Sequence, residues 1–208
     1  MRVAVRPLTE NDFDSVLALQ RLCFPPPFPA ECLWQREHLS AHLQRFPEGQ
    51  LVALLGGAVV GACSNARISV AAWEKRGSWE ETLTDWTLAG HDPTGKILFG
   101  ADISVNPDHR GLGIGRALYS ARYEYVIANN LYKYCTGCRL PDFRGWFGNG
   151  DPSTGDFLTY VGLVQTNELS DRTLTPLLRM GCTPVGVHAN YMDDAESANG
   201  AALLEWTP

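Results

Sequence analysis

Three glycines at alternate positions follow a run of apolar residues in the middle of the chain, at Gly111, Gly113 and Gly115. The run, 97–105, is predicted to be a β-strand, and the residues after the glycines, up to Ala128, a helix with one apolar face. The first N–H groups of a helix have no intrahelical partner and carry about half a positive charge. Because glycines let a ligand approach the backbone, this turn indicates an anion site, above all for a phosphate.

The spacing of the glycines narrows the choice of phosphate ligand. A dinucleotide-binding turn would need a third glycine at position 116, which is Arg116, and an acidic partner for the ribose is missing as well. A P-loop would need Gly-Lys followed by Ser or Thr, which the turn lacks. A tight turn without a ligand is the remaining alternative. It is disfavoured, since each glycine costs about 0.5–1 kcal/mol of stability.

The pattern R-x-x-G-x-G, formed by Arg110, Gly113 and Gly115, resembles the coenzyme A-binding motif of the GNAT superfamily of acetyl-CoA-dependent N-acyltransferases. The resemblance implies acetyl-CoA as cosubstrate and no metal. It implies that backbone N–H groups of the turn bind the pyrophosphate and that the end of the strand binds the pantetheine arm. The implied cofactor-binding residues are Ile103, Ser104, Val105, Arg110, Gly111, Leu112, Gly113, Ile114, Gly115 and Arg116.

The same resemblance implies direct attack of a primary amine on the acetyl thioester. An alkylammonium has a pKa near 10.4, so a base is needed at neutral pH, and a placed base contributes roughly 10²- to 10⁴-fold in rate. Asp102 is the one acidic residue in the run 97–105. We predict that Asp102 acts as the general base, through water. The alternatives are that its carboxylate binds backbone or a basic neighbour, or orients the acceptor amine.

Many GNAT enzymes protonate the departing thiolate with a tyrosine placed four residues before a Gly-Phe pair. Gly181-Cys182 occupies the place of that pair here, and the tyrosine position falls on Leu177. Tyr160, Tyr191 or water remain as candidates, and no acid is assigned.

The elements around this centre are predicted from periodicity and breakers. An edge strand at Arg2–Pro7 precedes a helix from Phe13, and the proline-rich loop 23–29 lies, by the resemblance, over the acceptor site. The remaining predictions are a helix at 31–45, a hairpin at 51–55 and 58–64, a strand at 132–138, helices at 156–165 and 172–180, and strands at 183–191 and 201–206. This order predicts one α/β domain over 1–208 with the GNAT fold: a mixed, mostly antiparallel sheet with splayed strands 4 and 5 and flanking helices.

An insert at 71–95 contains three tryptophans, Trp73, Trp79 and Trp86. They either wall an acceptor pocket or cover the sheet as core, and the core is favoured for any single one. His91 is expected to be a solvated turn residue. The segment 144–155 is predicted to be a long loop, and the roles of both segments stay open.

Composition limits the partners. The net charge of −6 disfavours nucleic acid and suits a cationic acceptor. No apolar run is long enough for a bilayer and no signal peptide is expected, so we predict a cytoplasmic protein. The six cysteines are expected to be free thiols in a reducing cytosol. The Cys135–Cys138 pair is not expected to bind zinc, because further ligands at the right spacing are missing.

Four further stretches resemble a GNAT branch that is sometimes fused to a nitrilase-like carbon–nitrogen hydrolase: Phe46–Gln50, His91–Gly95, Thr136–Pro141 and Leu204–Trp206. The branch does not define the acceptor, so a small amine and a peptide amino terminus both stay open. GNAT domains often pair, which allows a homodimer. Two other classes are weighed: a non-catalytic acyl-CoA-binding module, and a nucleotide-dependent oxidoreductase, which the glycine spacing disfavours.

Overall fold

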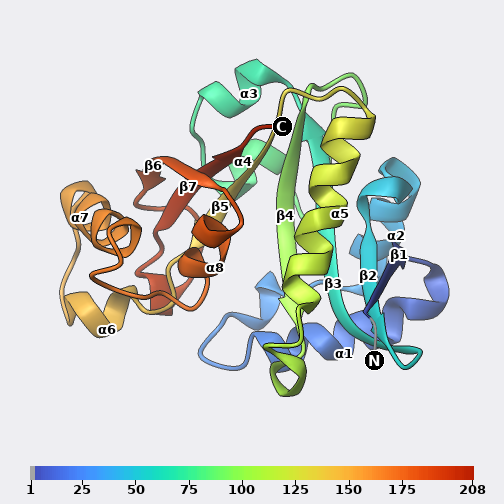
Figure 1. The fold of residues 1–208 in the computed structure, drawn as a ribbon, viewed down its shortest axis with the longest axis horizontal. Helices are drawn as coiled ribbons and strands as arrows, with labels where there is room; N and C mark the ends of the chain where they lie inside the picture. Colours follow the sequence, from blue (N-terminus) through green and yellow to red (C-terminus); the bar gives the residue numbers. More distant parts are fainter. Residues whose placement is uncertain (1–2) are drawn as a thin grey trace.

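The computed structural model describes residues 3–208 and contains a seven-stranded mixed sheet with the strand order β1-β2-β3-β4-β5-β7-β6 (Figure 1). All neighbouring strands are antiparallel except β4 and β5, which are parallel. The strands are β1 (Ala4–Pro7), β2 (Leu51–Leu55), β3 (Ala58–Ile68), β4 (Ile97–Val105), β5 (Lys133–Arg139), β6 (Thr183–His188) and β7 (Ala201–Trp206). The predicted mixed GNAT fold with flanking helices is confirmed.

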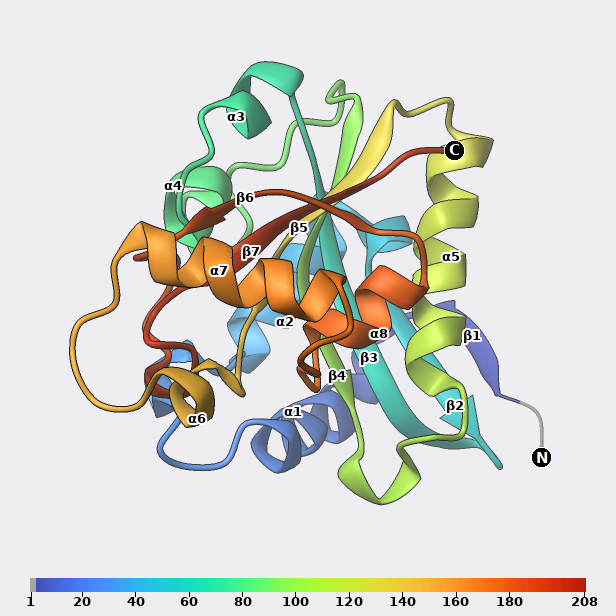
Figure 2. The same ribbon diagram turned by 60° about the vertical axis from the view of Figure 1, so that its left-hand side comes forward.

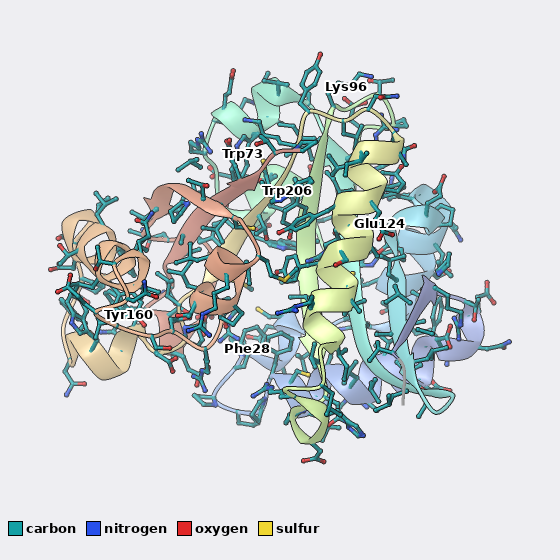
Figure 3. All side chains as sticks on the ribbon, in the orientation of Figure 1. Phe28, Trp73, Lys96, Glu124, Tyr160 and Trp206 are labelled. Carbon is teal, nitrogen blue, oxygen red and sulfur yellow. The ribbon has the colours of Figure 1, made fainter. Side chains whose placement is uncertain are left out.

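Helices cover both faces of the sheet (Figures 1 and 2). They are α1 (Phe13–Cys23), α2 (Arg36–Arg45), α3 (Val70–Glu74), α4 (Trp79–Leu83), α5 (Ile114–Ala128), α6 (Phe143–Phe147), α7 (Thr154–Gln165) and α8 (Leu174–Arg179). The apolar side chains of α1 to α4 pack in one core cluster, and those of α6, α7, α8 and most of α5 pack in another on the opposite face. The sheet therefore separates two layers of helices (Figure 3).

β4 and β5 separate halfway along their length. They pair only from Ile97 to Gly100 on β4. At the end of this pairing the Thr136 hydroxyl donates to the Gly100 carbonyl at 2.9 Å. A Cβ on Gly100 would lie 2.2 Å from the Tyr134 hydroxyl, so glycine is required there for the ring to pass. Beyond Gly100 the edge of β4 faces an open fork, and the predicted splay of strands 4 and 5 is confirmed.

A β-bulge at the base of the fork changes which way β4 side chains point. Ser64 of β3 pairs with Asp102, whereas the next residue, Asn65, pairs with Gly100, so Ala101 is the extra residue. Before the bulge Leu98 packs in the core on the α5 side. After the bulge the Asp102 carboxylate meets α1 on the opposite face. Bulges of this kind redirect side chains next to functional sites.

The first turn of helix α5 packs directly against the sheet. A Cβ on Gly61 of β3 would lie 2.7 Å from the Ile114 Cγ2 atom, so this glycine allows the first turn of α5 to contact β3. The predicted apolar face of the helix is wrong in part, because Ala128 is exposed and Arg122 is fully buried. Hydrophobic periodicity does not detect a buried arginine, since its burial depends on acceptors from other strands.

Some predicted boundaries and loops need correction. The second helix begins at Arg36 and not at Glu31, because the Trp34 backbone N–H donates to the Gln20 side-chain oxygen at 2.6 Å instead of forming a helical bond. The predicted loop 144–155 overlaps the short helix α6, whose Phe143 stacks on Phe157. Helix α3 was not predicted. Of the predicted first strand, Arg2 lies outside the described residues.

The remaining structural predictions concern His91, the cysteines, metal ligands and membrane-spanning helices. His91 is partly buried and not solvated, since its Nδ1 accepts from the Arg67 N–H at 3.0 Å and its ring stacks on Phe46. All six cysteines are free, with Cys135 and Cys138 packed on opposite faces of the sheet. Residues 3–208 contain no group of three or more potential metal ligands. None of the helices in this range has the length and hydrophobicity to span a bilayer.

Candidate functional site

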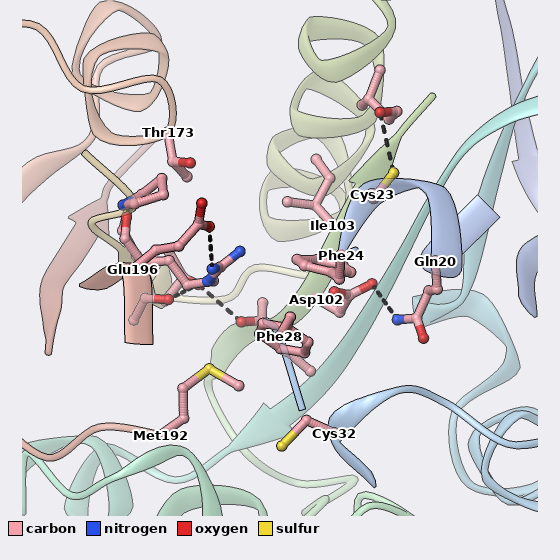
Figure 4. A pocket seen from close by; sticks show the side chains of 18 of the residues that line it. Gln20, Cys23, Phe24, Phe28, Cys32, Asp102, Ile103, Thr173, Met192 and Glu196 are labelled. Atoms are coloured by element: carbon pink, nitrogen blue, oxygen red, sulfur yellow. Dashed lines mark hydrogen bonds and ion pairs between the residues drawn. The ribbon is translucent and has the colours of Figure 1, made fainter. Parts of the chain in front are cut away.

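A cavity of about 510 Å³ occupies the fork between β4 and β5. It extends from Arg110, next to the glycine turn, past the end of β4 to Asp102. Beyond Asp102 it reaches an aromatic wall formed by Trp34, Trp79 and Trp86. Four segments far apart in the sequence close it: the α1–α2 loop, the α4 region, the start of α8 and the β6–β7 connection. The close-up in Figure 4 shows Asp102 beside Gln20, with Phe24 and Phe28 of the α1–α2 loop nearby.

The Asp102 carboxylate is partly buried and only loosely bonded. Its Oδ2 accepts from the Gln20 Nε2 at 3.3 Å and from the Ser104 hydroxyl at 3.4 Å, which are long hydrogen bonds. Burial raises the pKa of Asp102, and the Gln20 amide and the Arg122 charge oppose this rise. A carboxylate with a raised pKa and spare acceptor capacity is suited to taking up a proton.

Arg122 of α5 supports Asp102 from behind and was missed by the sequence analysis. Its side chain is 1% exposed. It donates to the backbone carbonyls of Asp102 and Ser64 and to the Tyr134 hydroxyl at 3.1 Å. The hydrogen bond from Arg122 goes to the backbone carbonyl of Asp102 and not to its carboxylate, so the carboxylate stays available to the cavity.

The glycine turn has the geometry expected of an anion site. Gly111 and Gly113 have φ values of +79° and +81°, and a Cβ at either position would meet no atom within 4 Å. The first backbone bond of α5 runs from the Ala117 N–H to the Gly113 carbonyl at 2.9 Å. The N–H groups of Ile114, Gly115 and Arg116 precede this bond and are open to a ligand.

Arg110 and Arg116, at the two ends of the glycine turn, differ in position. Arg110 lines the cavity, and no other side chain in the described part of the chain forms a hydrogen bond or ion pair with it. Arg116 and Leu112 are exposed and do not line the cavity. The structure therefore brings Arg110, but not the Arg116 side chain, to the same cavity as Asp102.

The predicted pantetheine segment forms the free edge of β4. Ile103 and Val105 line the cavity, whereas the Ser104 side chain is 1% exposed. The Val105 carbonyl accepts from the Cys23 thiol at 3.2 Å. Burial raises the pKa of Cys23 to about 11, so the thiol keeps its proton at neutral pH. Because β5 has diverged, the amides of a bound ligand can pair with this edge as an added strand would.

The candidates for the acid are separated by their positions. Tyr160 donates to the Asp171 Oδ2 at 2.9 Å and does not line the cavity. Tyr191 lines it, as do Leu177 and the unpredicted Tyr119. Burial raises the pKa of both Tyr119 and Tyr191 above the usual tyrosine value. Either hydroxyl therefore carries a proton at neutral pH.

Arg139 at the end of β5 joins two of the loops that close the cavity. Its guanidinium lies over the rings of Phe24 and Phe28, at 5.4 and 4.9 Å from their centroids. It donates to both carboxylate oxygens of Asp194, in the β6–β7 connection, at 2.6 and 2.7 Å. The prolines in the α1–α2 loop signalled a loop at this place, but no sequence pattern pointed to the arginine.

Comparison with known proteins assigns the family. Residues 13–144 match the acetyltransferase (GNAT) family, and the chain belongs to it. It is 34% identical over 204 residues to the uncharacterized N-acetyltransferase YkwB of Bacillus subtilis, covering 98% of this chain and 88% of YkwB. It is 32% identical to the probable hydrolase YhcX of the same organism, covering 99% of this chain but only 38% of YhcX. The predicted resemblance to a GNAT branch within larger hydrolase proteins is confirmed.

Solved structures show the same fold at low identity. The loading GNATL domain of CurA from Lyngbya majuscula superposes with a TM-score of 0.81 at 16% identity, covering 100% of this chain and 98% of that one. The GphF GNAT-like decarboxylase in complex with isobutyryl-CoA superposes with a TM-score of 0.74 at 23% identity, covering 98% of each chain. The ribosomal-protein-S18-alanine N-acetyltransferase of Escherichia coli gives 0.56 at 11% identity, covering 99% and 94%. An acyl-CoA is thus a ligand of a protein with this fold.

Proposed function

We propose that this chain is an N-acetyltransferase that moves the acetyl group of acetyl-CoA to a primary amine by direct attack. The observation that carries the proposal is the single cavity that joins Arg110 to Asp102 along the free edge of β4. The cavity brings together Arg110, a strand edge suited to pantetheine and the Asp102 carboxylate, while the turn residues 111–116 follow Arg110 outside the lining and are proposed to bind the pyrophosphate there.

In the proposed reaction the amine nitrogen forms a bond to the thioester carbonyl carbon. Asp102, directly or through water, accepts the proton that the nitrogen loses. The carbon–sulfur bond then breaks, and the sulfur of coenzyme A leaves with the bonding electrons and is protonated by Tyr119, Tyr191 or water. Placement of the two reactants in the closed cavity contributes to the rate, since aligned reactants can lower a barrier by several kcal/mol.

The test uses the purified chain, acetyl-CoA and a panel of primary amines, with N-acetylated products detected by mass spectrometry. We expect product from at least one amine. We expect Asp102→Asn to lower kcat about 10²-fold or more while the Kd of acetyl-CoA stays the same, because the amide cannot accept the proton. The wild-type rate should fall as the pH drops through the raised pKa of Asp102. Glu124→Gln, on the exposed side of α5, is the matched control.

Two outcomes would overturn parts of the proposal. Binding of acetyl-CoA without transfer to any amine would favour a non-catalytic acyl-CoA-binding module. An unchanged rate and pH profile in Asp102→Asn would remove the carboxylate from the role of base and leave it a structural or orienting group.

A second candidate function is decarboxylation of an acyl-CoA. It is suggested by the TM-score of 0.74 for the GphF GNAT-like decarboxylase, which exceeds the 0.56–0.61 of the acetyltransferase structures compared. Arg139 and Arg172 line the cavity and are cations of the kind that would bind a carboxylate, but both are paired with Glu196. Conversion of malonyl-CoA to acetyl-CoA and carbon dioxide without an amine would support this candidate.

A further inference from the structure

We propose that the acceptor is a small primary amine attached to an aromatic or other apolar group, and that it reaches Asp102 through a second, acidic cavity. This inference rests on the proposed acetyl transfer and narrows its substrate class. The family and the sequence leave a small amine and a peptide amino terminus equally open, so the choice depends on the walls of the cavity.

The second cavity, of about 340 Å³, adjoins the first. Both cavities are lined by five residues, which therefore lie where the cavities adjoin: Cys32, Trp79, Trp86, Tyr191 and Met192. Cys32 and Met192 lie at the same end of the pocket in Figure 4. Met192 is only partly buried, and its unbranched side chain changes conformation easily, which suits it to the passage between the cavities.

The second cavity is acidic. Glu80 and Asp193 line it and are exposed, and no lysine, arginine or histidine does so among the described residues. Such an opening raises the local concentration of cations and disfavours anions. A primary amine is mostly an alkylammonium ion at neutral pH and fits this charge.

Aromatic rings form the wall between the acidic opening and Asp102. Trp79 and Trp86 stack with centroids 4.5 Å apart, and Trp34 lies 6.0 and 5.7 Å from them. The wall is fixed, because the Trp79 Nε1 donates to the Ala101 carbonyl at 3.0 Å and the Trp86 carbonyl is bonded to His42 at 2.8 Å. Rings of this kind bind apolar groups by burial and an ammonium ion by cation–π attraction.

Two buried polar atoms at this wall form no full hydrogen bond among the described residues, although the Trp34 side chain lies near the Asp102 carboxylate and the Tyr191 hydroxyl near the Gly137 backbone. They are the Trp34 Nε1 and the Tyr191 Oη, whose side chains are 6% and 3% exposed. Both residues line the first cavity. An incompletely paired buried donor costs stability, and the Trp34 indole N–H lies next to Asp102, where it is available to a polar group of the substrate.

The charges inside the first cavity also select an amine. Arg122, Arg139 and Arg172 line it, but each donates to protein oxygens. Arg110 is at the coenzyme end. Among the charged side chains that line the first cavity, Asp102 is therefore the one available to interact with an acceptor. In addition, the Arg139 contacts to Phe24, Phe28 and Asp194 join the α1–α2 loop to the β6–β7 connection on one side of the cavity, which leaves less room for an extended peptide.

The experiment first measures the Kd of acetyl-CoA, and then compares acetylation of 2-phenylethylamine, ethylamine and a tetrapeptide with a free amino terminus. We expect kcat/KM to be highest for 2-phenylethylamine. We expect Trp86→Ala to raise its KM roughly tenfold, the size of a lost cation–π contact and apolar wall, with the Kd of acetyl-CoA unchanged. Trp86→Phe keeps a ring and should keep most of the affinity, which excludes misfolding as the cause.

The acidic opening is tested separately. Glu80→Gln combined with Asp193→Asn should raise the KM for 2-phenylethylamine by about twofold to fivefold at low salt and by less at high salt, because exposed charges are screened. Glu124→Gln is the control and should change nothing. Acetyl-CoA binding with preferred acetylation of the tetrapeptide would overturn the inference and leave acetyl transfer intact. Absence of acetyl-CoA binding would overturn the proposed function itself.

Discussion

Replacement of Gly113 by alanine should separate ligand binding from folding. Gly113 has φ of +81°, a conformation in which a side chain costs about 1–2 kcal/mol, and a Cβ there would meet nothing within 4 Å. The chain provides a matched control in Gly57, in the β2–β3 hairpin, with φ of +87° and equally open space. Both substitutions should therefore cost the free protein the same strain and no steric clash.

The size of the effect can be worked out for both variants. For a chain of 208 residues a loss of 1 kcal/mol lowers Tm by about 2–4 °C, so each variant should melt about 2–8 °C below the wild type. In the proposed binding mode, only Gly113→Ala places a methyl group where the pyrophosphate approaches the N–H groups at the start of α5. We expect the Kd of acetyl-CoA to rise about tenfold or more in this variant, equivalent to about 1.4 kcal/mol, and to stay unchanged in Gly57→Ala.

The assay is thermal melting at several concentrations of acetyl-CoA, because a ligand that binds only the folded state stabilises it by RT ln(1 + [L]/Kd), so that a weaker affinity gives a smaller rise in Tm. Gly57→Ala should show the full rise and Gly113→Ala a reduced one, with Gly113→Glu showing none. Equal rises in all three variants would refute the assignment of the turn to the pyrophosphate. Unequal melting temperatures of the two alanine variants without ligand would refute the strain argument.

The remaining predictions concern stability. Burial lowers the pKa of His42 to about 4 from its ordinary value of 6.5, so the unfolded chain binds a proton that the folded chain does not, and stability should fall by up to about 3 kcal/mol as the pH drops from 6.5 to 4. Urea unfolding across this range should show the slope, and His42→Gln should reduce it. Arg139→Met should cost about 3–5 kcal/mol, because it leaves the Asp194 carboxylate, 2% exposed, without its cation. Adding Asp194→Asn should recover part of that loss in a double-mutant cycle, and strictly additive losses would contradict the pairing. Gly61→Val should cost about 1–3 kcal/mol by pushing on Ile114, and Ile114→Ala in the same chain should make the valine less damaging, as denaturant titrations can measure.

The local patterns of the sequence were sufficient for most of the fold. The strand at 97–105, the glycine turn and the helix after it form one contiguous unit, whose hydrogen bonds and backbone angles depend on residues close in sequence. The hairpin at Gly56-Gly57 is of the same kind and was predicted correctly. These are places where a residue's own conformational preference decides the structure.

The side chains that close the cavity were harder to predict. Trp73 and Trp79 are buried in the core as expected, but Trp79 and the partly buried Trp86 also line the cavity. Nothing in the local sequence distinguishes the three tryptophans. Their positions differ because different segments of the chain pack against each of them in the fold. Arg122 and Arg139 were missed for the same reason, since the oxygens that bind them come from residues up to 58 positions away.

The direction in which the Asp102 side chain points depends on the tertiary structure and does not follow from the sequence alone. The sequence identified it as the one acid in an apolar strand, and simple alternation would place it on the same face as Leu98, toward α5. The extra residue Ala101 shifts the register against β3 and turns Asp102 toward Gln20 and the cavity instead. Hydrophobic alternation follows from the residues of one strand alone. A bulge depends on the pairing of two strands, and only the folded sheet specifies it.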